Sequence, residues 1–249
     1  MTKEQIELLI NIKRGELSEE DKVIVARGQL DVAKEELESY CSNLGDTYQA
    51  INDNVLDWLM EDDDEEALEG GATILQLREK NKSTMEYIEL AEKVHEITKR
   101  YNVPLIIDDR VDVALAIDAE GVHVGAEDMP IATARKLMGN DKIVGATAKT
   151  VPWAKEAYEQ GADYLGVGAI YPTTTKVKTV LTSVDTLKNI VKAVPIKVNA
   201  IGGLNKDNIH ILKNSGINGI CAVSAIMKSD NPSNTAKELR EAFDELQQN

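Results

Sequence analysis

The feature that most constrains the fold is a change of hydrophobic pattern near residue 66. Beyond it, short apolar runs of strand length alternate with amphipathic helical stretches, a pattern typical of the β/α units that build a parallel sheet. The predicted strands are residues 73–78, 104–108, 121–125, 142–147, 164–170, 196–203 and 219–224. We therefore expect an α/β fold over residues 66–249.

The segments that lead into these strands favour a TIM (β/α)8-type parallel barrel. Gly-Gly-Ala-Thr at 70–73, Gly-Ala-Asp-Tyr at 161–164 and Gly-Ile-Asn-Gly at 216–219 place glycine where a helix ends and the chain turns into the sheet. A doubly wound open sheet is the alternative, but no Gly-x-Gly-x-x-Gly turn follows an early strand. The helix after the first strand is predicted to begin at Ser83, because Glu86 completes a capping box.

Residues 1–65 are predicted to form an acidic helical extension. Residues 1–66 hold 19 of the 43 acidic residues and 6 of the 28 basic ones, which argues against nucleic acid or an anionic membrane as a partner of this segment. Apolar residues spaced three and four apart from Val23 to Leu44 indicate a coiled-coil-like helix. Pairing of such helices between chains would make a homo-oligomer, and a packed helical cap is the alternative.

The sequence shows no sign of export or of membrane insertion. No stretch approaches the roughly eighteen apolar residues of a membrane span, and the first residues lack the pattern of a signal peptide. We expect a soluble, cytoplasmic protein.

Polar and charged side chains follow the first predicted strand. Because side chains alternate between the two faces of a strand, Gln76, Arg78 and Lys80 point one way, while Leu75 and Leu77 point toward the outer helices. One amide and two cations would then line the mouth of the barrel. Ordinary surface charges on a solvated strand end are the alternative.

Carboxylates follow the next two strands. Strand 104–108 ends at Asp108 and Asp109, and Asp128 follows strand 121–125. Carboxylates from the loops of neighbouring strands can share a divalent cation, and Mg²⁺ prefers one or two carboxylates together with phosphate oxygens and water. His123, inside its strand, is interpreted as a core histidine with satisfied hydrogen bonds, in preference to a ligand or base.

Three later segments have the composition of anion sites. The turn Tyr-Pro-Thr-Thr-Thr-Lys at 171–176 is rich in hydroxyls and carries one cation, as an anion-binding loop requires, although a plain polar turn is the alternative. The last two strands end in Ala-Ile-Gly-Gly at 200–203 and Ala-Val-Ser-Ala-Ile at 222–226, where barrels often bind phosphate on backbone amides. Together these motifs predict two anion sites and a metal site on a single rim.

In this order, the motifs resemble the thiamine phosphate synthase family over about residues 66–227. The matching motifs are Gly-Gly-Ala-Thr, Gln-Leu-Arg-Glu-Lys, Asp-Asp-Arg, Gly-Val-His-Val-Gly-x-Glu-Asp, Pro-Thr-Thr-Thr-Lys and Ala-Ile-Gly-Gly. The resemblance implies a transferase that joins a pyrimidine diphosphate to a thiazole phosphate and releases pyrophosphate by a dissociative reaction assisted by Mg²⁺. Metal and cations would stabilise the departing charge by electrostatics and positioning.

The resemblance also assigns roles to individual residues. It implies Mg²⁺ bound by Asp109 and Asp128, and catalytic cations at Arg78, Lys80 and Lys176. The residues implied to bind the two substrates are Gln76, Arg78, Lys80, Asp108, Thr147, Thr173, Thr175, Lys176, Gly203, Val223 and Ser224. In this set, Gln76 orients the pyrimidine, and Thr173, Thr175 and the backbones of Gly203, Val223 and Ser224 hold the thiazole phosphate.

The chain departs from the family pattern at three places. Asp108 stands where Asn is usual, and Thr147 where Ser is usual. The usual first strand, which resembles Leu-Tyr-Leu-Val-Thr-Asp, is not recognisable before residue 66. Either residues 21–26 or 54–60 form that strand, or the barrel has seven strands and an edge that must be covered.

Two other functions are considered. A thiazole tautomerase of the same fold uses a histidine near the end of the strand 142–147, and this chain reads Gly-Ala-Thr-Ala-Lys-Thr at 145–150. The other alternative is a non-catalytic binding or assembly protein whose incomplete barrel binds a thiamine-related ligand. Retention of the charged set favours the synthase.

Overall fold

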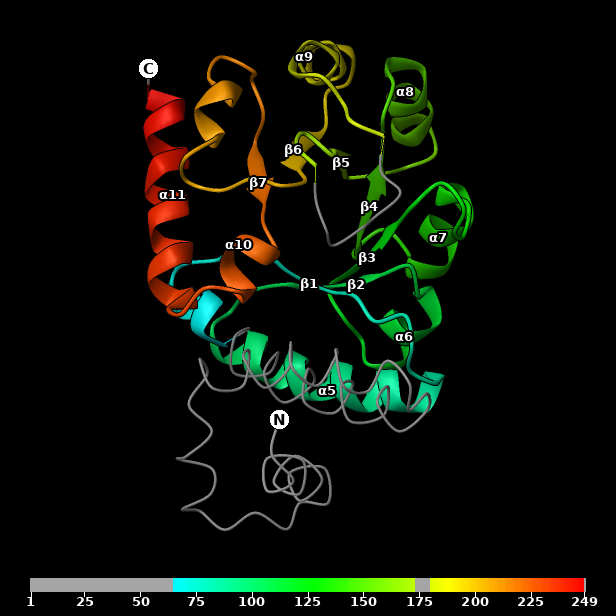
Figure 1. Ribbon diagram of the computed structural model, residues 1–249. Helices are drawn as coiled ribbons and strands as arrows, with labels where there is room; N and C mark the ends of the chain where they lie inside the picture. Colours follow the sequence, from blue (N-terminus) through cyan, green and yellow to red (C-terminus); the bar gives the residue numbers. More distant parts are fainter. Residues whose placement is uncertain (1–64, 173–179, 249) are drawn as a thin grey trace, which may run out of the picture. The chain divides into compact units, whose positions relative to one another are not determined.

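The computed structural model describes residues 65–172 and 180–248, all within the unit that spans Asp64–Asn249. In this part of the chain one sheet of seven parallel strands follows the chain order from β1 to β7 (Figure 1). The strands are β1 (Leu75–Leu77), β2 (Leu105–Asp108), β3 (Gly121–Val124), β4 (Ile143–Thr147), β5 (Tyr164–Gly168), β6 (Lys197–Ile201) and β7 (Gly219–Cys221). Each lies within a range predicted from the sequence, so the parallel β/α prediction is confirmed.

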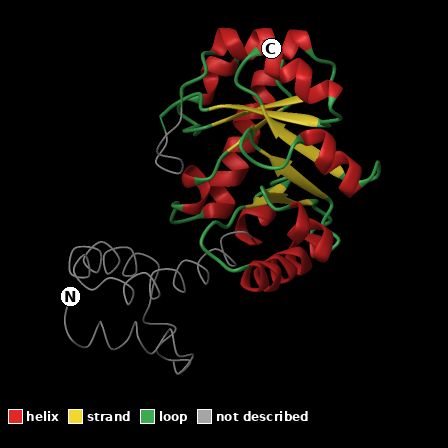
Figure 2. Ribbon diagram, turned by 90° about the vertical axis from the view of Figure 1, so that its right-hand side faces the viewer, coloured by secondary structure: helices red, strands yellow, loops and turns green. Residues whose placement is uncertain are grey.

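Helices connect successive strands and cover the outer face of the curled sheet (Figure 2). They are α5 (Thr84–Arg100), α6 (Val111–Ala116), α7 (Ile131–Met138), α8 (Val151–Glu159), α9 (Val184–Ala193), the 3-10 helix η1 (Ile209–Leu212), α10 (Ser224–Met227) and α11 (Pro232–Gln248). The predicted start of α5 is confirmed, because the Ser83 side chain accepts from the Glu86 amide while Glu86 accepts from the Ser83 amide at 2.8 Å. Every helix of the described residues is too short or too polar to cross a membrane.

The apolar core lies between the sheet and the outer helices. Along each strand alternate side chains point outward, and those of Leu75, Leu105, Val122, Val144 and Leu165 are buried there. They pack against apolar faces such as that of α5, where Tyr87, Leu90, Ala91 and Val94 are buried. The predicted direction of Leu75 and Leu77 is therefore confirmed.

The inner face of the sheet is built differently, because polar side chains and glycines stand there beside isoleucines such as Ile106. In register across the sheet, Asp108 pairs with His123 and His123 with Gly145, which also pairs with Tyr164. A Cβ atom on Gly145 would lie 2.2 Å from Cζ of Tyr164. Glycine is thus required there because the tyrosine ring occupies the space. Barrel interiors are more commonly filled by Val, Ile and Leu.

Among the described strands, β1 and β7 are the two outer strands of the sheet. The segment leading into β1 lies against α11 (Figure 1), because a Cβ atom on Gly70 would be 2.2 Å from the Ser233 carbonyl oxygen and Arg240 Nη1 donates to the Gly71 carbonyl at 2.9 Å. Both segments considered for the missing first strand, residues 21–26 and 54–60, lie outside the described residues. The same holds for the predicted extension up to residue 64.

Candidate active site

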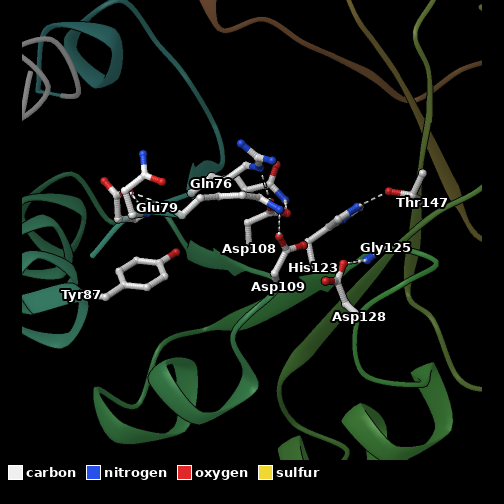
Figure 3. A network of polar contacts seen from close by, with 12 residues as sticks. Gln76, Glu79, Tyr87, Asp108, Asp109, His123, Gly125, Asp128 and Thr147 are labelled. Carbon is white, nitrogen blue, oxygen red and sulfur yellow. Dashed lines mark hydrogen bonds and ion pairs between the residues drawn. The ribbon is translucent and has the colours of Figure 1, made fainter. Parts of the chain in front are cut away.

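Polar side chains from β1 and β2 meet at the carboxyl ends of these strands. Gln76 and Asp108 lie side by side (Figure 3), where Gln76 Nε2 donates to Asp108 Oδ1 at 3.2 Å. Arg78 Nε lies 2.9 Å from Asp108 Oδ2. Parallel pairing brings the two strand ends together, since Gln76 is in register with Ile106. One carboxylate therefore holds an amide and a guanidinium at the rim, as the alternation of side chains predicts.

Asp109 lies just beyond β2 in a backbone conformation that is uncommon for a non-glycine residue. Its φ is 63°, in the left-handed region, and its amide donates to the His123 carbonyl at 2.8 Å. Such strain is often found at functional sites. Lys80 Nζ lies 2.8 Å from Asp109 Oδ2, so the second cation after β1 also has a carboxylate partner.

Asp128 approaches Asp109 from the loop after β3. The two carboxyl groups interact closely enough to shift each other's pKa, and the Gly125 amide donates to Asp128 Oδ2 at 2.9 Å (Figure 3). A Cβ atom on Gly125 would lie 2.8 Å from that oxygen, so glycine permits the close approach. The two carboxylates predicted to share a cation are thus adjacent.

The two carboxyl groups differ in acidity. Burial alone would raise the pKa of Asp109, but hydrogen bonds from Lys80 and Asp128 lower it below its ordinary value. Burial and the hydrogen bond with Asp109 raise the pKa of Asp128.

This pair fits a magnesium ion. Two interacting carboxyl groups at the same rim present oxygens that one divalent cation can bind. Among the described residues no group of three or more His, Cys, Asp or Glu side chains forms a metal cage. Mg²⁺ commonly binds one or two protein carboxylates and completes its shell with water and phosphate, so the donor set suits Mg²⁺ in company with a phosphorylated substrate.

Asp108 is the most strongly perturbed carboxyl group of the site. It is buried, with 8% of its surface exposed. Burial and the charge of Asp109 raise its pKa to about 6, against the opposing effect of Arg78 and Lys80. At neutral pH the folded protein therefore holds a carboxylate that is costly to bury.

Replacing Asp108 with asparagine is expected to raise the stability of the metal-free protein, and to raise it more at pH 8 than at pH 5. Because the pKa is 3.8 ordinarily and about 6 in the folded protein, the folded protein binds a proton that the unfolded chain releases, and stability falls as pH rises through about 6. At 1.36 kcal/mol per pKa unit, the free energy of unfolding of the variant, relative to that of the unmodified protein, increases by about 1.4 kcal/mol from pH 5 to pH 8. Urea denaturation in the presence of EDTA measures it.

Asp112→Asn is the matched control. The hydrogen bond from Arg110 lowers the pKa of Asp112, so its carboxylate stabilises the folded protein above its ordinary pKa, and this variant loses a little stability as pH rises. If the two variants showed the same pH dependence, the assignment of Asp108 as a group with a raised pKa would be wrong.

Thr147, at the end of β4, is joined to the interior of the sheet. His123 Nε2 lies 3.0 Å from Thr147 Oγ1, and His123 Nδ1 lies 3.0 Å from the Tyr164 hydroxyl. Both ring nitrogens of the buried His123 have hydrogen-bond partners, as predicted for a satisfied core histidine. The histidine nevertheless links a predicted site residue to β5.

The loops after β5 and β6 are adjacent. The Tyr171 amide donates to the Gly202 carbonyl at 3.0 Å, and Gly203, with φ of 63°, would place a Cβ atom 2.6 Å from the Pro172 carbonyl oxygen. β6 and β7 pair through Ile201 and Cys221, so Gly203, Val223 and Ser224 all follow two neighbouring strand ends. Thr173, Thr175 and Lys176 lie outside the described residues, and their placement stays a prediction.

Two tyrosines contribute to the site without having been selected from the sequence as site residues. The Tyr87 hydroxyl of α5 donates to the Leu77 carbonyl at 2.9 Å and so holds the end of β1 beside Arg78. Tyr164 contacts His123 from β5. The sequence pattern places Tyr87 only in the helix predicted to begin at Ser83, and Tyr164 only at the start of a predicted strand. The available signal is a tyrosine, with its polar hydroxyl, at an inward-facing strand position or on a core-facing helix turn.

The fold and the site define a class of protein. A curled parallel sheet covered by helices, with charged side chains gathered at the carboxyl ends of its strands, is the organisation of a β/α-barrel enzyme. The chain belongs to the family described as thiamine monophosphate synthase, whose sequence pattern matches residues 49–226. Every predicted site residue lies inside this match, and thiamine-phosphate synthases are transferases.

Curated relatives and a solved structure agree with this family. A thiamine-phosphate synthase of Methanobrevibacter smithii is 52% identical over 179 residues, covering 72% of this chain and 86% of the relative. One of Clostridium tetani is 49% identical over 181 residues, covering 73% and 87%. The structure of thiamine phosphate pyrophosphorylase from Pyrococcus furiosus superimposes with a TM-score of 0.69 at 41% identity, covering 75% of this chain and 90% of that one.

More distant structures share the fold alone. A 3-hexulose-6-phosphate synthase superimposes with a TM-score of 0.53 at 19% identity, covering 72% of this chain and 94% of that one.

Proposed function

We propose that this chain is a thiamine phosphate synthase that joins 4-amino-2-methyl-5-pyrimidinylmethyl diphosphate to thiazole phosphate and releases pyrophosphate. The observation that carries the proposal is the meeting of two cations, Arg78 and Lys80, with the adjacent carboxyl groups Asp109 and Asp128 at one rim. The relatives that bear this name support it.

The diphosphate is proposed to bind where Arg78 and Lys80 now pair with carboxylates. Arg78 lies beside Asp108 and Lys80 beside Asp109, and the side chains of the two cations are 36% and 49% exposed, so both are accessible to a ligand. The predicted third cation is Lys176. Asp108, where Asn is usual, places a carboxylate in this region that a bound diphosphate must tolerate.

Asp109 and Asp128 are proposed to hold Mg²⁺. When bound, the ion would neutralise charge that develops on the departing pyrophosphate. The Gly125 amide and Lys80 each hold one of the two carboxylates in place, so the donor oxygens are oriented before the substrate arrives.

The pyrimidine is proposed to bind between Gln76 and Thr147. Because the Gln76 amide nitrogen donates to Asp108, its carbonyl oxygen is the group left to accept a hydrogen bond from an amino substituent. The thiazole phosphate is proposed to bind the backbones of Gly203, Val223 and Ser224, together with Thr173 and Thr175.

The proposed reaction is a dissociative substitution. The carbon–oxygen bond between the methylene group and the diphosphate breaks, both electrons leave with pyrophosphate, and the resulting pyrimidine methylene cation is captured by the thiazole nitrogen. The side chains act by positioning and electrostatic stabilisation, since no covalent bond to the protein is required.

Pyrophosphate release by the full chain, measured with each substrate alone and with both, tests the proposal. A synthase releases pyrophosphate at a sustained rate only when both substrates and Mg²⁺ are present. A non-catalytic binding protein would bind the ligands without turnover. A thiazole tautomerase would isomerise a thiazole without consuming the pyrimidine diphosphate, and either result contradicts the proposal.

For residues 1–65 we propose an acidic helical extension that pairs chains into a homo-oligomer in the cytoplasm. The heptad spacing from Val23 to Leu44 supports this. Light scattering of the full chain and of a chain lacking residues 1–60 tests it, because an unchanged number of chains per particle contradicts pairing through this segment.

A further inference from the structure

A chain of polar side chains crosses the inner face of the sheet beneath the rim. It runs from Tyr164 on β5 to His123 on β3 and from there to Thr147 on β4, with both hydrogen bonds 3.0 Å long. Figure 3 shows the His123 ring directed toward Thr147. These hydrogen bonds connect the inside of the sheet to Thr147, a residue with a proposed role in substrate binding.

Glycines make room for this chain of side chains. A Cβ atom on Gly145 would lie 2.2 Å from Cζ of Tyr164, and one on Gly166 would lie 3.2 Å from Cε1 of His123. The two rings are also in contact, with centroids 5.4 Å apart. Both rings are therefore held by close packing, which fixes the direction of their hydrogen bonds.

The phenol of Tyr164 determines which group donates in each of these hydrogen bonds. Burial raises the pKa of Tyr164, so its oxygen keeps the proton, and a phenol withdrawn from water needs an acceptor for its O–H. Among the described residues the hydrogen-bond partner of this hydroxyl is His123 Nδ1. The hydroxyl therefore donates to Nδ1, and the neutral imidazole carries its hydrogen on Nε2.

That hydrogen is then donated to Thr147 Oγ1, 3.0 Å away. Because the oxygen of Thr147 accepts this bond, its own O–H remains a hydrogen-bond donor. Thr147 is half-buried at the carboxyl end of β4, the same edge of the sheet at which Gln76 and Asp108 meet.

We propose that Tyr164 and His123 are positioning residues that make Thr147 a hydrogen-bond donor toward a ring nitrogen of the aminopyrimidine substrate. With the carbonyl oxygen of Gln76 as an acceptor, the rim offers one donor and one acceptor. An aminopyrimidine has the complementary pair, a ring nitrogen that accepts and an amino group that donates. The substrate part of this inference rests on the proposed function.

The tautomer of His123 is tested directly by ¹⁵N NMR of the ligand-free protein, with its signals assigned by loss in His123→Asn. We expect hydrogen on Nε2 in the unmodified chain. In Tyr164→Phe, which removes the donor to Nδ1 and keeps the ring, we expect this preference to be lost. Hydrogen on Nδ1 in the unmodified chain would overturn the proposal whether or not the enzyme turns over.

Kinetics test the link to the substrate. Tyr164→Phe and Thr147→Val are each expected to lower kcat/KM for the pyrimidine diphosphate about tenfold, as for one hydrogen bond, while the Kd of inorganic pyrophosphate with Mg²⁺ changes less than twofold. Tyr101→Phe is the control, since its hydroxyl bonds Glu65 and Glu69 away from the site. The double variant is expected to match Thr147→Val alone, because both changes remove one interaction.

Two results would overturn the proposal that Tyr164 and His123 position Thr147. One is an additive loss of kcat/KM in the double variant, and the other is a Tyr164→Phe enzyme as active as the unmodified chain. Thermal melts identify a variant that fails to fold, in which case Thr147→Val and the tautomer of the unmodified chain decide the question. If the unmodified chain shows no turnover, the proposed function and the substrate part of this inference fall together. The tautomer measurement stands apart from that outcome.

Discussion

Asp109→Asn is expected to lower kcat/KM for pyrophosphate release by about 10²–10³-fold, the usual cost of removing one preorganised group that stabilises developing charge. Asparagine keeps the size of the side chain and tolerates the left-handed backbone of this position, where φ is 63°. The substitution therefore removes one negative charge with little strain. Initial rates over a range of Mg²⁺ concentrations measure the loss, and the concentration needed for half-maximal rate is expected to rise.

Asp112→Asn is the control for this experiment. Asp112 lies three residues further on, is 58% exposed and pairs with Arg110. The substitution Asp112→Asn therefore removes the same charge from the same region of the chain without changing a residue of the rim. Its rate is expected to stay within twofold of the unmodified enzyme. If Asp109→Asn kept its rate and its Mg²⁺ dependence, the assignment of the carboxyl pair as the metal site would be wrong.

Arg78→Ala is expected to lower kcat/KM by a similar factor of about 10²–10³, and to weaken the binding of inorganic pyrophosphate. Two effects combine in this variant. The diphosphate loses a guanidinium donor, and Asp108 loses the partner that lies 2.9 Å from its Oδ2, which leaves a buried carboxylate uncompensated. Steady-state kinetics and calorimetry with pyrophosphate measure both consequences.

The double variant Arg78→Ala with Asp108→Asn separates these effects. If the loss arises from the missing donor, the double variant remains as slow as Arg78→Ala, whereas recovery of the rate would assign the loss to the unpaired carboxylate. Arg100→Ala is the control, since this arginine is 61% exposed and pairs with Glu65 on the surface. Equal losses in Arg100→Ala and Arg78→Ala would contradict the role proposed for Arg78.

The sequence predicted the strands and the rim residues well, for a physical reason. Strand patterns are local, and in a parallel sheet every strand ends at the same edge, so Arg78, Asp108 and Asp128 could be placed together once the β/α pattern was recognised. The capping box of Ser83 and Glu86 is also local, and it lies where the sequence placed it. The family assignment depended on these same short motifs.

Other features could not be predicted because they depend on register and on the packing of distant residues. The pairing of Gly145 with Tyr164 is set by how β4 lies against β5, and no local pattern specifies it. The raised pKa of Asp108 results from burial together with the charge of Asp109. The hydrogen bond from Tyr87 to the Leu77 carbonyl likewise joins a helix to a strand that only the tertiary structure brings together.

By itself, the sequence determined that the chain builds a parallel β/α sheet and that its cations and carboxylates follow the strands. Hydrophobic periodicity and strand ends depend only on residues that are close together in the sequence. Only the tertiary structure decided that Arg78 and Lys80 each pair with a carboxylate, and that His123 on β3 is hydrogen bonded to residues of β4 and β5. Those facts depend on distances of about 3 Å between residues far apart in the chain, and such distances are fixed by the packing of the whole sheet.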